Sequence, residues 1–111
     1  MYIYKIYFST DVDYKQTNKL ISELETLFLN NSINLDGFTI IKTEGYYKGE
    51  IETSYIFKYI DNMSSDYEIF RDDKICIMND TDNIIKRLSK LIKSYFQQKE
   101  VLTIKQKIDI L

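Results

Sequence analysis

The feature that most constrains the fold is a change in hydrophobic spacing along the chain. Some stretches place β-branched and aromatic residues close together or at alternate positions, and two longer stretches repeat apolar residues every three or four positions. The first pattern is typical of β-strands and the second of amphipathic helices. The order is strand, helix, strand, strand, helix, strand. The 111 residues, 44% of them hydrophobic, suit one domain spanning residues 1–111.

The first half of the chain predicts three strands and one helix. Residues 2–9 are apolar on both faces, which favours a central strand. Residues 14–30 predict a helix, capped by Asp11 or Asp13. A second strand starts at Phe38, and a third spans residues 50–60. A hairpin-like connection between Gly45 and Gly49 joins these two strands.

The second half predicts an insertion, a helix and a last strand. Residues 61–80 form the insertion, in which residues 67–70 and 74–78 could pair as a small hairpin. The motif Asp80-Thr81-Asp82 predicts the cap of a second helix that runs to about Gln97. Alternation resumes from Leu102. The predicted fold is therefore α+β and ferredoxin-like, a βαββαβ antiparallel sheet with both helices on one face.

The residue types exclude most familiar catalytic and metal sites. The chain has no histidine and a single cysteine, Cys76, so a Ser-His-Asp triad, a disulfide and the usual zinc sites are excluded. No glycine-rich phosphate loop is present. From this we predict a protein that is not an enzyme and that holds no cofactor and no metal.

The segment from Gly45 to Glu52 is the first candidate binding region. Its glycines permit a close approach of the backbone to a partner, and aromatic and charged side chains surround them. The candidate residues are Tyr46, Tyr47, Lys48, Glu50 and Glu52. A flexible hairpin tip without a partner is the alternative.

The insertion is the second candidate region. Its acids Asp66, Glu68, Asp72 and Asp73 could face a basic partner, although solvated loop acids are the simpler reading. Residues 61–83 carry seven acids and two bases, and residues 84–107 carry seven bases and one acid. The net charge of −2 and pI of about 5.1 disfavour nucleic acid as a partner, although they leave it open. Without a signal peptide or a long apolar run, we expect a cytoplasmic protein without membrane contact.

Several short motifs resemble those of known proteins. They are Asp36-Gly37-Phe38-Thr39, Gly45-x-Tyr47-x-Gly49-x-x-Glu52, and Phe96-x-Gln98-x-x-Val101-Leu102. They resemble an uncharacterised group of small bacterial and phage proteins, with Tyr47 where that group usually has tryptophan. The plan is also similar to PII-like and CutA-like proteins. That similarity implies a possible homo-oligomer that binds a nucleotide or second messenger.

These observations lead to two predicted functions, and an enzyme that uses carboxylates alone, for example a metal-dependent nuclease, is a less favoured third. The first is a small interaction protein, encoded by a phage or mobile element, that binds a host protein complex such as a CRISPR or other defence effector and modulates or inhibits it. It is motivated by the divided charge and by the ten tyrosines, which favour interfaces. The alternative is a PII-like oligomeric module that binds a small ligand.

Overall fold

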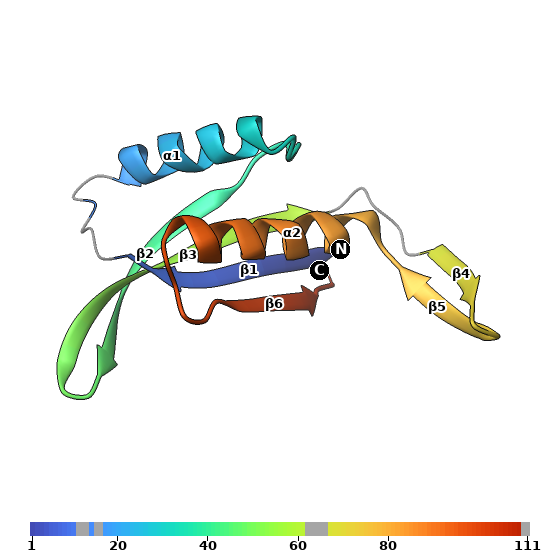
Figure 1. Cartoon of the computed structure of the whole chain (residues 1–111). Coiled ribbons are helices and arrows are strands. Elements are labelled where there is room, and N and C mark those ends of the chain that lie inside the picture. The colour runs from blue at the N-terminus through green and yellow to red at the C-terminus, as the bar shows by residue number, and fades with distance from the viewer. Residues whose placement is uncertain (11–13, 15–16, 62–66, 110–111) are drawn as a thin grey trace.

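The predicted order of strands and helices is confirmed in the computed structural model, which describes residues 1–10, 14, 17–61 and 67–109 (Figure 1). In chain order the elements are β1 (Tyr2–Ser9), α1 (Thr17–Asn30), β2 (Thr39–Tyr47), β3 (Glu50–Asp61), β4 (Tyr67–Arg71), β5 (Lys74–Met78), α2 (Asp80–Tyr95) and β6 (Leu102–Lys107). None of the helices in these ranges is long and apolar enough to cross a membrane.

The main sheet has four antiparallel strands in the order β2-β3-β1-β6. Strand β1 is central, as its two apolar faces predicted. Both helices lie on the same side of the sheet (Figure 1). The α+β, ferredoxin-like prediction is therefore confirmed. The predicted small hairpin is also confirmed, and β4 and β5 form a separate two-stranded sheet.

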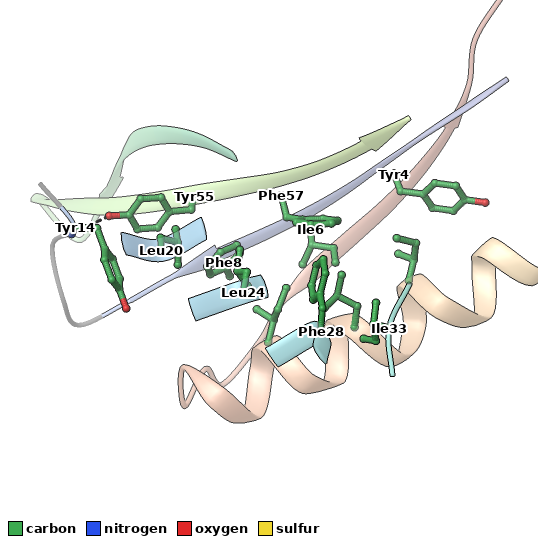
Figure 2. Close-up of a cluster of buried hydrophobic side chains, with 13 residues drawn as sticks. Tyr4, Ile6, Phe8, Tyr14, Leu20, Leu24, Phe28, Ile33, Tyr55 and Phe57 are labelled. Atoms are coloured by element: carbon green, nitrogen blue, oxygen red, sulfur yellow. Dashed lines mark hydrogen bonds between the residues drawn. The ribbon is translucent and has the colours of Figure 1, made fainter. Parts of the chain in front are cut away.

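The core lies between the helices and one face of the sheet (Figure 2). Alternate residues of β1 and β3 point into it, among them Ile6 and Phe57, which are fully buried. The two helices supply apolar residues three and four positions apart. The buried helix residues are Leu20, Leu24 and Phe28 from α1 and Ile85, Leu88 and Ile92 from α2.

The remaining residues of these strands form the open face, which no helix covers. The strand register places Ile3, Lys5 and Tyr7 of β1 on this face. The same register adds Thr39, Ile41 and Thr43 of β2, Ser54, Ile56, Lys58 and Ile60 of β3, and Leu102, Ile104 and Gln106 of β6. The open face is therefore mixed, with apolar side chains beside lysine, threonine, serine and glutamine.

A polar contact joins the helix side of the sheet to the start of α2. The hydroxyl of the buried Tyr4 donates a hydrogen bond to Asp82 Oδ1 at 2.5 Å. Lys105 Nζ, from β6, lies 3.0 Å from the same oxygen. The contact holds the first turn of α2 against the central strand.

Both helix starts differ from the predictions. Helix α1 begins at Thr17 rather than at residue 14, and Asp11 and Asp13 lie outside the described residues. Helix α2 is capped by Asn79, whose side chain accepts a hydrogen bond from the Thr81 N–H at 2.9 Å. Asp80, predicted as the cap, is the first helical residue. Asn79 is the better cap because its extended backbone allows its side chain to reach that N–H.

Helix α2 ends at Tyr95 rather than at Gln97. Gln97 takes φ 53°, and the Gln98 N–H donates to the Lys93 carbonyl at 2.9 Å, which closes the helix. The Gln98 side chain then accepts a hydrogen bond from the Ser9 hydroxyl at 2.8 Å. The Phe96-x-Gln98 motif thus ties the end of β1 to the α2–β6 junction.

The connection between β2 and β3 is shorter than predicted. Strand β2 continues to Tyr47, so the turn consists only of Lys48 and Gly49. Their φ angles are 50° and 80°, as in the type I′ turn that suits the twist of a two-residue hairpin.

Candidate functional site

Two adjoining hollows lie on either side of the segment from Asp36 to Phe38, which connects α1 to β2. The larger has a volume of about 440 Å³ and lies against α1, and the smaller, of about 360 Å³, lies against the start of β2 and the end of β3. Asp36, Gly37 and Phe38 line both. Each volume is in the range of small-molecule sites.

The end of α1 shapes the larger hollow. Ser32 takes φ 54°, and the Ile33 N–H donates to the Phe28 carbonyl at 2.9 Å, which reverses the chain after the helix. Ile33 is buried, so the following residues turn back toward the sheet. Polar and apolar groups contribute about equally to the wall. The apolar side chains are Ile21, Phe28, Leu29, Ile33 and Leu35, and the polar ones are Glu25, Asn34 and Asp36.

Phe38 forms the partition between the hollows. Its ring centroid lies 5.2 Å from that of Phe28 and 5.1 Å from that of Phe57. Phe57 is fully buried, so this aromatic cluster anchors the partition to the core. Aromatic pairs at such distances add to the stability given by burial.

The smaller hollow is polar and mainly acidic. Asp36 and Asp61 line it with Tyr59 and Lys58. Burial, followed by the negative charges of Asp61 and Asp36, raises the pKa of Tyr59. The Tyr59 hydroxyl therefore stays protonated at neutral pH and can donate a hydrogen bond.

This arrangement suits a ligand that has an apolar part and a cationic part. A flat ring could lie against the apolar side chains of the larger hollow, and an ammonium group could lie near Asp36 and Asp61. Aromatic faces such as that of Phe38 also attract cations. Lys58, across the register from Thr39, supplies one positive charge for an anionic group.

The predicted hairpin residues lie elsewhere. Tyr46 of β2 is 78% exposed, Lys48 is in the turn, and Glu50 and Glu52 lie on β3. Tyr47 ends β2, although its side chain is outside the described part of the structure. Tyr46, Lys48, Glu50 and Glu52 line neither hollow. Their role in binding stays a prediction.

The predicted acids of the insertion occupy the β4–β5 hairpin. Glu68 is exposed on β4, and Asp72 and Asp73 form the turn with φ 52° and 58°. Asp66 lies outside the described residues. The structure does not bring the two candidate regions together, because the two hairpins project from opposite ends of the molecule (Figure 1). Within the described ranges, no three acids or cysteines gather as a metal site.

The residues of the two hollows were mostly missed by the sequence analysis. Asp36 and Phe38 had a signal, because they belong to one of the motifs that carried the resemblance. Lys58 and Tyr59 had none, because they continue the alternation of an ordinary strand. The sequence pattern assigns Asp61 to the acids of the insertion, whereas it is the last residue of β3. Only the pairing of β3 with the start of β2 brings them beside Asp36.

A second polar cluster surrounds Tyr14. Its hydroxyl donates to the Glu23 carboxylate, and Lys42 Nζ donates to its carbonyl at 3.1 Å. The Tyr14 N–H donates to the Tyr55 hydroxyl at 3.1 Å. Burial, followed by the bond to Glu23, raises the pKa of Tyr14. The cluster ties residue 14 to the sheet and to α1, which is a structural role.

Comparison with known proteins supports the fold. No protein-family description and no curated sequence matches the chain. A solved structure of a phage SAM lyase in the apo state is similar, with a TM-score of 0.64 and 16% identity over 95% of this chain and 78% of the lyase. The same values of TM-score and identity hold for the phage SAM lyase in complex with S-methyl-5′-thioadenosine, over 96% of this chain and 80% of the lyase.

The comparison contradicts the prediction that the chain is not an enzyme. Two solved structures that share its fold over nearly its whole length are structures of an enzyme, a phage SAM lyase. The prediction rested on missing histidine, metal and nucleophile motifs. That argument fails for a substrate that carries its own leaving group, because such a substrate needs binding and orientation more than a reactive side chain.

Proposed function

We propose that this chain is an enzyme that binds SAM, taken as S-adenosylmethionine, and cleaves it to S-methyl-5′-thioadenosine. The observation that carries the proposal is the TM-score of 0.64 to a phage SAM lyase over 95% of the chain. The structure of that lyase with S-methyl-5′-thioadenosine supports the choice of ligand.

The chemistry suits a chain without histidine. The sulfur of S-adenosylmethionine is a sulfonium, so it leaves with the electron pair of the broken carbon–sulfur bond and becomes a neutral thioether. The carboxylate of the substrate can attack the same carbon and form a carbon–oxygen bond, which gives a lactone. Atoms and charges then balance without water, a metal or a protein nucleophile. The protein has to fold the substrate so that the carboxylate faces the carbon.

The apolar part of the larger hollow would favour this step. The reaction removes one positive and one negative charge, so a surface of low polarity beside the reacting groups destabilises the substrate relative to the transition state. Ile21, Phe28 and Leu35 provide such a surface on one part of the wall, whose lining also includes the polar Glu25, Asn34 and Asp36. We propose that this hollow holds the adenosine and sulfonium part of the substrate.

The acidic hollow would hold the part of the substrate that keeps its charge. The ammonium group is positive before and after cleavage, so carboxylates can bind it without opposing the reaction. The exposed Asp36 would make this contact, the buried Asp61 would add negative charge beneath it, and the Tyr59 hydroxyl would donate to the substrate carboxylate. In this proposal Asp36, Tyr59 and Asp61 position the substrate.

The direct test is to incubate the purified chain with S-adenosylmethionine and measure S-methyl-5′-thioadenosine by liquid chromatography and mass spectrometry. We expect turnover without added metal. Asp36→Asn and Tyr59→Phe should each lower kcat/KM by about tenfold or more, since each removes a charged or hydrogen-bonding contact. Asp109→Asn, an exposed residue outside both hollows, is the matched control and should keep full activity.

Two outcomes would count against the proposal. Absence of the thioether product from a folded preparation would contradict the activity. Full activity in the Asp36 and Tyr59 variants, with loss in Glu50→Gln or Glu52→Gln, would move the site to the β2–β3 hairpin.

Binding of a host protein complex, such as a CRISPR effector, stays a prediction of the sequence, because no comparison tests it. The same holds for an origin in a phage or mobile element and for a nucleotide or second messenger as ligand.

A further inference from the structure

The β4–β5 hairpin is separate from the main sheet. Among the described residues its two strands pair only with each other, and it projects beyond the start of α2 (Figure 1). A two-stranded hairpin is marginally stable in water unless it packs against something. The hairpin therefore has a face that a partner would stabilise.

One face of this hairpin is apolar and acidic. Phe70 and Ile75 lie directly opposite each other in the register and are 72% and 65% exposed. Alternation places Glu68 on the same face, and Asp72 and Asp73 form the tip. The basic residues Arg71 and Lys74 are the next pair in the register after Phe70 and Ile75. Since side chains alternate between the faces, Arg71 and Lys74 belong to the other face.

The open face of the main sheet carries exposed apolar side chains and positive charges, which complement the apolar and acidic face of the hairpin. Leu102 is 58% exposed, Ile60 49%, and Ile104 38%. Between them, Lys5 and Lys58 lie directly opposite each other on neighbouring strands. Strand β6 borders this face and is exposed along its whole length, so its outer backbone edge is also available.

We propose that the β4–β5 hairpin of one copy of this chain docks on the open face of a second copy, beside β6. Phe70 and Ile75 would cover Leu102 and Ile104. Glu68, Asp72 and Asp73 would then lie near the lysine pair, which gives the contact its direction. The contact joins two different surfaces of the chain. In a dimer each copy therefore docks its hairpin on the open face of the other, and in a small ring each copy docks its hairpin on the next.

The test uses two sets of substitutions at exposed positions, so each chain should fold. The hairpin variant is Phe70→Lys with Ile75→Lys, and the face variant is Leu102→Glu with Ile104→Glu. We expect native mass spectrometry to show an oligomer for the unmodified chain. Each variant alone should be monomeric, with a dissociation constant raised at least about tenfold. Circular dichroism should show unchanged secondary structure.

Mixing the two variants distinguishes this contact from others. A hairpin-defective chain keeps an intact open face, and a face-defective chain keeps an intact hairpin. Their equimolar mixture should therefore form a mixed dimer that neither forms alone. A monomeric unmodified chain, an oligomer that survives the hairpin substitutions, or a mixture without mixed dimers would each overturn the proposal. The second result would indicate packing of one open face on another.

Discussion

The two faces of the main sheet have similar strand sequences but different surroundings. On the helix side, Ile6 and Phe57 are completely buried under α1 and α2. On the open face, Ile60 and Leu102 are about half exposed, although they are as apolar as their neighbours. The comparison teaches that alternation assigns a residue to a face, whereas only the packing of the helices decides which face becomes the core.

The largest difference between the faces should come from Phe57. Phe57→Ala removes a fully buried ring that also contacts Phe28 and Phe38. We expect a loss of about 3–5 kcal/mol in the free energy of unfolding, from lost burial and a residual cavity. Urea denaturation followed by circular dichroism measures it. A loss under about 1 kcal/mol would mean that this side is not the core.

A smaller effect should come from the polar contact on the helix side. Tyr4→Phe keeps the buried ring and removes the hydrogen bond to Asp82. We expect a loss of about 1.5–3 kcal/mol, the usual range for a hydrogen bond to a charged group. Combining it with Asp82→Asn in a double-mutant cycle isolates the pair. Additive losses would show that the two side chains do not interact.

The third prediction concerns alkaline pH, and it involves the helix side only. The pKa of Tyr14 is raised in the folded state, so its stabilising effect is complete below the unfolded pKa of about 10 and is lost as the pH rises above it. Tyr14→Phe should make the fall in stability between about pH 9 and pH 11 less steep. Denaturant titrations at both values measure this. An equally steep fall would show that Tyr14 does not cause it.

The smallest effect should come from the open face. Ile60→Thr replaces a half-exposed side chain with one of equal β-propensity, so the free energy of unfolding of the isolated chain should change by less than about 0.5 kcal/mol. The measurement is made at a dilution where the chain is monomeric. A loss as large as that of Phe57→Ala would mean that both faces are covered.

Much of the fold could be predicted from the sequence, because it depends on local periodicity. The pattern around Leu20 and Leu24 identifies α1, and the two apolar faces of residues 2–9 place β1 at the centre. Caps were less accurate. Asn79 and Asp80 are both good capping residues, and the choice depends on a backbone angle that the sequence does not specify.

The candidate site was harder to predict because it combines distant segments. Asp36 and Tyr59 become neighbours only when β2 pairs with β3. Tyr46 and Glu52 stand out in the sequence instead, because glycines beside aromatic residues are a local signal. The absence of histidine is evidence against catalysis only for reactions that need a protein acid, base or nucleophile.

The tight turn at Lys48 and Gly49 has a consequence for the whole sheet. Both residues have left-handed backbone angles, so the turn admits two residues and fixes which partner each position of β2 meets on β3. One added residue there would shift the frame of the hairpin by one step. Ile40 and Phe57 would no longer meet, and if β2 followed the new frame it would turn Thr39, Ile41 and Thr43 to the helices in place of Ile40 and Lys42. A turn of only two residues therefore keeps Ile40 and Phe57 on the core side of the sheet.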